Sequence, residues 1–230
     1  MAAMAAYVMA MIKVAVCPVT PFQQNCSLVW CEETGQGALV DPGGDLERLK
    51  DAVAQTGMKV AKVMLTHGHV DHASAAGAIA EHYGVQIEGP HEGDRYLIEG
   101  LPDSNRKYGF TVPEPFLPDR WLEDGDTVEL GKLTFDVVHC PGHTPGHVVF
   151  VNKHEKARIA FVGDVLFRGS VGRTDFPKGD QAQLFHSIRK KLFPLGDDIG
   201  FVPGHGQTST FGWERKTNPF VCDMLFEDGE

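Results

Sequence analysis

The chain has 230 residues, enough for a sizeable core in one large domain or two small ones. Its formal net charge of −10 argues against a nucleic-acid-binding protein, which would carry a basic face. No apolar run approaches the roughly 20 residues that span a bilayer, so we expect no membrane segment. The five cysteines are odd in number and lack CxxC spacing, which argues against a disulfide framework and favours a cytoplasmic protein.

The first residues carry little structural patterning. Residues 1–12 are mildly apolar and Met-rich, and no basic segment precedes them. We therefore interpret them as a disordered extension rather than as a signal peptide. No linker-like change of composition follows, so residues 13–230 are predicted to form a single domain.

Apolar and β-branched runs predict short strands in both halves of the chain. They lie at residues 13–18, 25–31, 37–40, 60–65, 85–88, 127–130, 133–139, 147–152, 159–162 and 199–202. Helical spacing predicts helices at residues 45–56, 73–83, 92–100 and 180–192, and the proline-rich residues 109–118 predict an irregular loop. Because these elements interleave without simple βαβ alternation, we predict an α/β fold of two packed sheets with helices outside.

The densest chemical signal is at residues 66–72, Thr-His-Gly-His-Val-Asp-His, directly after an apolar strand. Three imidazoles and a carboxylate in six residues are ligand types that suit zinc, iron or manganese. Gly68 permits a tight turn that lets neighbouring side chains converge. A solvated histidine-rich loop would be an unusual way to end a buried strand, so we predict a metal site.

Three later positions repeat this arrangement of an apolar strand, a glycine turn and one ligand-type side chain. They present His143 after residues 137–140, Asp164 after residues 159–162 and His205 after residues 199–202. A single Gly-His or Gly-Asp turn is common in any protein. Four recurrences of one pattern predict side chains that meet at one rim of the sheets.

These residues resemble the metal-binding set of the metallo-β-lactamase fold superfamily. Segments 23–26, 66–72, 140–147, 168–175 and 203–211 are similar to the short glyoxalase II-like hydrolases of that superfamily. The resemblance spans residues 13–220 and implies a four-layer αββα sandwich with two mixed sheets. It also implies a thioester hydrolase whose small-molecule substrate is S-lactoylglutathione, another glutathione conjugate or a related acyl thioester.

The resemblance further implies two bound divalent metal ions, zinc foremost, with iron or manganese as alternatives. His67, His69 and His143 would hold the first ion, Asp71, His72 and His205 the second, and Asp164 would bridge both. A hydroxide between two cations about 3.5–4 Å apart would attack the thioester carbonyl. Asp71 would have a catalytic role as well, by orienting that nucleophile.

Substrate selection is expected to involve residues 168–175, which contain two arginines in a glycine-rich stretch. Arg173 lies where glyoxalase II enzymes place a glutathione-binding lysine, and it could bind a substrate carboxylate or pair with Asp175. Asp175 lies where those enzymes have a tyrosine. The chain also ends about 25 residues after His205, too soon for the C-terminal helical region that completes their glutathione site.

Two other functions remain open from the sequence. A mononuclear iron persulfide dioxygenase of the same fold would use His67, His143 and Asp164 as a facial triad, and it shares a Gly-Arg-Thr-Asp-Phe stretch like residues 172–176. A non-catalytic metal-binding protein is the other. Because structural zinc sites are closed and have four ligands, a seven-residue set favours the enzyme.

Overall fold

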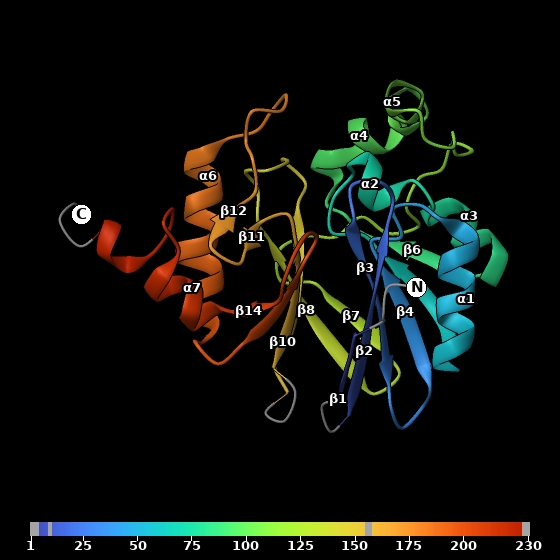
Figure 1. The fold of residues 1–230 in the computed structure, drawn as a ribbon, viewed down its shortest axis with the longest axis horizontal. Helices are drawn as coiled ribbons and strands as arrows, with labels where there is room; N and C mark the ends of the chain where they lie inside the picture. The colour runs from blue at the N-terminus through green and yellow to red at the C-terminus, as the bar shows by residue number, and fades with distance from the viewer. Residues whose placement is uncertain (1–4, 9–10, 155–157, 227–230) are drawn as a thin grey trace.

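The protein is described by a computed structural model that covers residues 5–8, 11–154 and 158–226, which form two six-stranded sheets packed face to face (Figure 1). The first has the order β1-β2-β3-β4-β5-β6, with strands Ala5–Val8, Ile12–Val19, Gln24–Cys31, Gln36–Val40, Lys59–Met64 and Gln86–Glu88. The second has the order β14-β13-β10-β9-β8-β7, with strands Ser209–Thr210, Gly200–Pro203, Ile159–Gly163, Val148–Asn152, Leu133–His139 and Thr127–Leu130. Both sheets are mixed, because β4-β5-β6 and β10-β13 are parallel and the other pairs are antiparallel.

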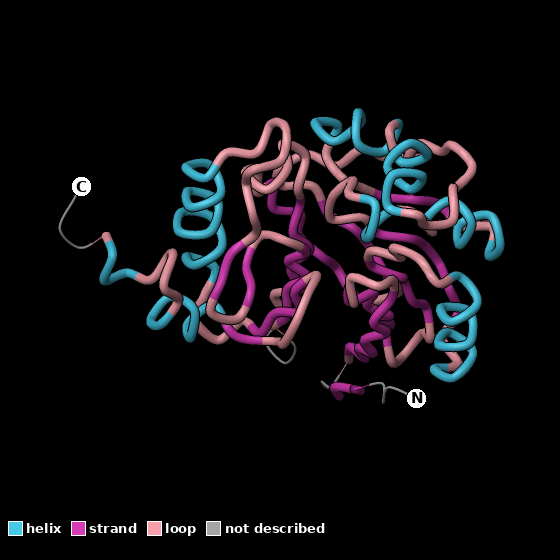
Figure 2. The backbone as a smooth tube through the Cα atoms, turned by 45° about the horizontal axis from the view of Figure 1, so that its top comes forward, coloured by secondary structure: helices cyan, strands magenta, loops and turns pink. Residues whose placement is uncertain are grey.

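Helices cover the outer face of each sheet (Figures 1 and 2). The first sheet is covered by α1 (Leu46–Thr56) and α3 (Ala76–Tyr83), and the second by α6 (Gln181–His186) and α7 (Phe211–Thr217). Three more helices, α2 (Val70–Ala73), α4 (Arg95–Glu99) and α5 (Leu101–Tyr108), gather at one end of the sandwich. This four-layer αββα arrangement confirms the predicted fold class.

The interior divides into three apolar layers, as a four-layer sandwich requires. The middle layer lies between the two sheets and contains Phe135, Phe150 and Phe161. The outer layers lie between each sheet and its helices, around Leu49 on one side and Leu184 on the other. Apolar burial of this extent holds the two sheets at a fixed separation, which fixes the distance between loops that leave opposite sheets.

Several elements differ from the sequence predictions. Within residues 1–12, Ala5–Val8 form β1 and pair with the edge of β2, so a fully disordered extension is wrong for that stretch; residues 1–4 and 9–10 lie outside the described part of the chain. Backbone pairing rather than a side-chain pattern defines this strand. The helix predicted at residues 73–83 begins later, as α3 at Ala76, and the short α2 that ends at Ala73 was not predicted; nor was α5.

The helices and the cysteines of the described residues can be compared with two expectations from the sequence. None of the helices in the described ranges has the length and apolarity needed to cross a bilayer. All five cysteines are buried and free of disulfides, as their spacing indicated. They pack as small apolar side chains.

Replacing Phe161 with Ala is expected to lower the free energy of unfolding by about 3–5 kcal/mol. Phe161 is 2 % exposed and its ring centroid lies 6.1 Å from that of Phe135, so truncation leaves a cavity between the sheets. Urea denaturation would measure the loss. Phe220→Ala is a matched control, because Phe220 is 42 % exposed and its truncation leaves the core intact.

Candidate metal centre

The loop that follows β5 carries four of the seven predicted ligand residues. Its start is fixed by Asp41, which accepts hydrogen bonds from the backbone N–H and the hydroxyl of Thr66 at 2.7 and 2.6 Å. The chain then turns into α2, whose first turn presents Asp71 and His72. Gly43 packs against this turn so closely that an added Cβ would lie 1.4 Å from the carbonyl oxygen of Asp71, so only glycine fits there.

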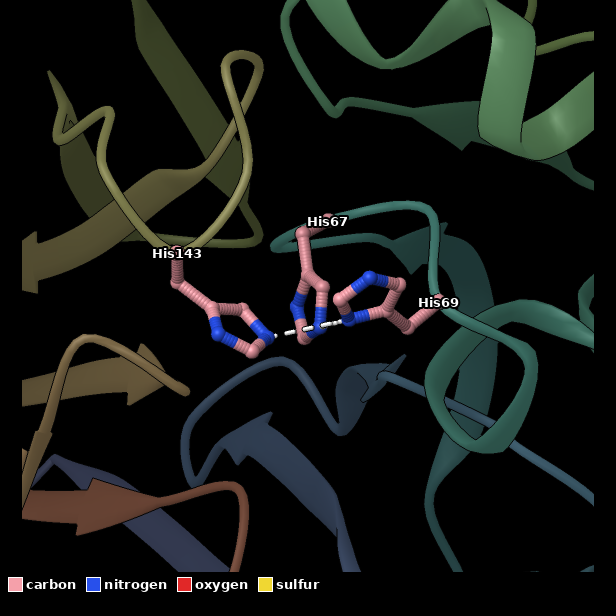
Figure 3. A group of neighbouring side chains, drawn as sticks. All are labelled: His67, His69 and His143. Atoms are coloured by element: carbon pink, nitrogen blue, oxygen red, sulfur yellow. Dashed lines mark hydrogen bonds between the residues drawn. The ribbon is translucent and has the colours of Figure 1, made fainter. Parts of the chain in front are cut away.

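The first group of candidate ligands is formed by His67, His69 and His143 (Figure 3). Nδ1 of His69 lies 3.2 Å from Nε2 of His67 and 2.9 Å from Nε2 of His143. Nitrogens that share a tetrahedral zinc ion at 2.0–2.1 Å are separated by about 3.3 Å. The three imidazoles, brought from opposite sheets, are therefore spaced as ligands of one ion.

The second group is formed by Asp71, His72 and His205. Oδ2 of Asp71 lies 3.2 Å from Nε2 of His205 and 3.9 Å from Nε2 of His72. His205 follows β13 of the second sheet, whereas the other two residues belong to α2 beside the first sheet. The group therefore spans the two sheets, as the first group does.

Asp164 lies between the two groups. Its Oδ1 is 3.4 Å from Nε2 of His72, and its Oδ2 is 3.6 Å from Nε2 of His143 and 3.7 Å from Nε2 of His205. Each carboxylate oxygen thus faces a nitrogen of the second group, and one also faces the first group. This is the position that a bridging carboxylate would occupy.

Burial keeps the first group neutral. It lowers the pKa of His67, His69 and His143, that of His69 to about 3, and positive charge on neighbouring imidazoles would lower it further. Neutral imidazole is the form that binds a metal ion. All three side chains are therefore ready to coordinate near pH 7.

In the second group, neighbouring opposite charges rather than burial set the direction of the pKa shifts. Burial alone would lower the pKa of His72, but the carboxylates of Asp164 and Asp71 outweigh it and hold that pKa above its usual value. Burial alone would raise the pKa of Asp164, but His72 and other imidazoles hold it below its usual range. The buried carboxylate of Asp164 and the half-buried carboxylate of Asp71 therefore require positive charge beside them, which a metal ion would supply.

Outer contacts turn the ligand nitrogens toward one another. A histidine whose Nδ1–H donates a hydrogen bond keeps its lone pair on Nε2. Three histidines use Nδ1 in this way: His72 toward Oδ2 of Asp41 at 2.9 Å, His143 toward the carbonyl of Arg173 at 2.6 Å, and His205 toward the carbonyl of Phe22 at 3.2 Å. Their Nε2 atoms are therefore free to accept a cation.

Two inward atoms, which lie 3.4 Å apart as an ion-pair contact, make no hydrogen bond to the described residues of the protein. Nε2 of His72 and Oδ1 of Asp164 are buried and make no hydrogen bond in the described structure. Leaving buried polar atoms unpaired costs about 1–3 kcal/mol each. Bound cations would satisfy both atoms, so the residues present fit the predicted metal ions.

His147 is also part of this centre, whereas the sequence favoured partial burial in a strand for both His139 and His147. Its side chain is fully buried, its Nε2 accepts a hydrogen bond from the backbone N–H of Asp164 at 3.0 Å, and its ring stacks on His67 at 4.6 Å. His139 instead donates to the carbonyl of Pro145 at 2.8 Å and stays outside the site.

Asp94 contacts the loops of this centre, and the sequence did not predict that role. Its Oδ2 accepts hydrogen bonds from the N–H of Gly68 at 2.9 Å and from the hydroxyl of Thr144 at 2.8 Å. Its Oδ1 accepts from the N–H of Gly146 at 2.7 Å. Burial raises the pKa of this carboxyl to about 6 against the effect of these donors. One side chain thus ties the loop of His67 to the turn of His143.

A cavity of about 710 Å³ opens onto the candidate metal centre. Five of the candidate ligand residues line it: His69, Asp71, His143, Asp164 and His205. Aromatic and aliphatic side chains make most of its wall: Phe22, Val70, Tyr96, Leu97, Tyr108, Phe167, Val171, Phe176 and Pro177. An open, largely apolar cavity that ends at polar groups is typical of a small-molecule site.

Arg173 lines this cavity, but its guanidinium has a partner. Nε and Nη2 donate to the two carboxylate oxygens of Asp175, each at 2.6 Å, and the same group lies 4.4 Å over the ring of Phe176. Of the two roles that the sequence left open, the structure shows the ion pair. Both partners are largely exposed, so the pair contributes little to stability.

Comparisons with known proteins agree with this geometry. The family model described as "Metallo-beta-lactamase superfamily" matches residues 19–205. The hydroxyacylglutathione hydrolase GloC of Haemophilus influenzae is 46 % identical over 211 residues, which cover 91 % of this chain and 98 % of that protein. The mitochondrial persulfide dioxygenase ETHE1 of Homo sapiens is 31 % identical. The match covers 81 % of this chain and 67 % of that protein.

Solved structures show the same fold. The di-iron-bound form of TTHA1623 has a TM-score of 0.80 and 39 % identity, covering 90 % of this chain and 99 % of that one. The BLEG-1 B3 metallo-beta-lactamase has a TM-score of 0.82 and 32 % identity, and the match covers 92 % of this chain and 99 % of that one. Fold, centre and relatives together define a metal-dependent hydrolase of the glyoxalase II-like kind. The chain belongs to the metallo-beta-lactamase superfamily.

Proposed function

We propose that the protein is a dinuclear thioester hydrolase of the glyoxalase II type, acting on S-lactoylglutathione or a related acyl thioester. The observation that carries this proposal is the position of Asp164 between two three-residue donor groups that border an open cavity. A relative at 46 % identity that is a hydroxyacylglutathione hydrolase supports the choice of substrate.

Each residue has a role in this proposal. His67, His69 and His143 would hold one metal ion, Asp71, His72 and His205 would hold the other, and Asp164 would be a ligand shared by the two. Such ions, with zinc as the expected metal, would supply a water-derived hydroxide near neutral pH and charge stabilisation for the carbonyl oxygen. Asp71 also orients the attacking water by accepting its hydrogen bond, and its location at the cavity wall supports that role.

Nearby side chains position these groups. Asp41 and the carbonyl groups of Arg173 and Phe22 hold the imidazoles in the tautomer that faces inward. The apolar wall of the cavity excludes bulk water from the acyl group, which strengthens every charge interaction at the centre. A substrate bound in this cavity would therefore lie beside the donor groups that line it.

Removing the metal ions is expected to abolish thioester hydrolysis. Purified protein would be assayed on S-lactoylglutathione before and after dialysis against a chelator, and activity should return when zinc is added back. Turnover that survives complete metal removal, or no turnover on any glutathione thioester, would overturn the proposal. Circular dichroism of the stripped protein is the control, because loss of fold would also stop turnover.

A second candidate function is a persulfide dioxygenase with one iron ion. It is favoured by the relative with that activity at 31 % identity and by Arg173 and Phe176, which line the cavity, with Asp175 paired to Arg173. His67, His143 and Asp164 would form the iron-binding triad. The hydrolase makes fuller use of the site, because the triad leaves four candidate ligands without a metal: His69, Asp71, His72 and His205. Oxygen consumption with a persulfide substrate would favour the dioxygenase.

A further inference from the structure

The cavity at the metal centre contains one cation that the proposed chemistry does not use. Besides histidines, two cationic side chains line the cavity, Lys107 and Arg173. The guanidinium of Arg173 is held by both oxygens of Asp175. Lys107 is exposed and has no acidic partner among the described residues; its ammonium lies 5.7 Å from the ring centroid of Tyr108. Lys107 is therefore the cation available to a ligand.

Helix α5 presents Lys107 as part of a polar stripe. Ser104, Lys107 and Tyr108 are spaced i, i+3 and i+4, so they lie on one face of the helix, and all three line the cavity. The face that holds Leu101 and Asn105 is buried against the protein. The stripe thus offers a hydroxyl, an ammonium and a phenol to the same cavity as the metal centre.

Aromatic packing places this stripe beside the second donor group. The ring of Tyr108 packs edge-on against Phe22, with centroids 5.6 Å apart. The carbonyl of Phe22 accepts the hydrogen bond from Nδ1 of His205. The stripe and the second donor group are therefore linked through one residue. In the metal-loaded enzyme the bound cations would offset the charge of Asp71 and Asp164, and the ammonium of Lys107 would attract an anionic part of a substrate.

We propose that Ser104, Lys107 and Tyr108 of α5 form the subsite for the anionic thiol half of an acyl thioester, with Lys107 pairing with its carboxylate. This inference rests on the proposed thioester hydrolysis and names its substrate class: thioesters whose leaving thiol carries a carboxylate. The hydroxyl groups of Ser104 and Tyr108 hydrogen-bond to polar groups of the same half.

The test uses two substrates that share one acyl group. S-lactoylglutathione carries free carboxylates, and its dimethyl ester has both blocked while the thioester is unchanged. In the metal-loaded enzyme, Lys107→Ala is expected to raise KM for S-lactoylglutathione about fivefold with little change in kcat, as for loss of one exposed ion pair. KM for the dimethyl ester should not change, and Lys107→Arg should retain the low KM for S-lactoylglutathione.

Arg106→Ala is the matched control, because Arg106 is the neighbouring cation on α5, pairs with Asp103 and does not line the cavity. It should leave both KM values unchanged. Equal effects of Lys107→Ala on both substrates would overturn the inference, as would a substrate-selective rise in KM that follows Arg173→Ala instead. Failure of the unmodified enzyme to hydrolyse either substrate would overturn the proposed function and this inference with it.

Discussion

Asp164→Asn is expected to lower kcat/KM for thioester hydrolysis by about a thousandfold, the order seen when one transition-state charge group is lost. The amide has no negative charge and presents an NH₂ group to one of the nitrogens that now face a carboxylate oxygen. The loss of charge should also lower the metal content. Kinetics on S-lactoylglutathione and metal analysis of the same preparation measure the two effects.

The control for this variant is a carboxylate far from the centre. Asp136→Asn makes the same chemical change at a half-buried residue that pairs with Lys153 at 2.9 Å. It should leave both activity and metal content unchanged. An Asp164→Asn enzyme with full activity and two metal ions would contradict the assignment of Asp164.

Asp94→Asn is expected to weaken metal binding by about 10–100-fold, as for other residues that orient metal ligands. The carboxylate accepts from Gly68, Thr144 and Gly146, and an amide can satisfy donors on only one of its two sides. The loops of His67 and His143 would then lose their common anchor. Competition with a chelator of known affinity would measure the metal dissociation constant.

Stability must be measured alongside, because Asp94 is fully buried. Asp119→Asn is the matched variant, since Asp119 accepts a backbone hydrogen bond from Ile87 at 2.8 Å but contacts no metal loop. A merely structural role for Asp94 would lower the melting temperature and leave metal affinity unchanged. That outcome would contradict the positioning role.

The sequence predicted the sheets and the candidate ligands for the same physical reason. Apolar strands have a strong pattern, and a ligand at the end of a strand after a glycine is visible without knowing the fold. The structure brings His143, Asp164 and His205 to the motif at residues 66–72, as that pattern implied. The identity of the metal could not be predicted from the sequence, because histidine and aspartate side chains bind several metals.

Other parts of the site could not be predicted from local pattern. Asp94 accepts hydrogen bonds from backbone N–H groups 26 and 52 residues away, and no local sequence pattern predicts partners at such distances along the chain. Helix α5 has Pro102 in its first turn and buries the polar Asn105, so it lacks the apolar spacing of a predictable helix. The polar stripe of Ser104, Lys107 and Tyr108 that lines the cavity could therefore not be predicted from the sequence.

The central claim is that two metal ions act together in hydrolysis. The direct test is a titration of metal-stripped protein with zinc while S-lactoylglutathione hydrolysis is followed. The account predicts that turnover reaches its maximum at two equivalents of zinc per chain. A maximum at one equivalent, with no further gain from the second, would contradict it.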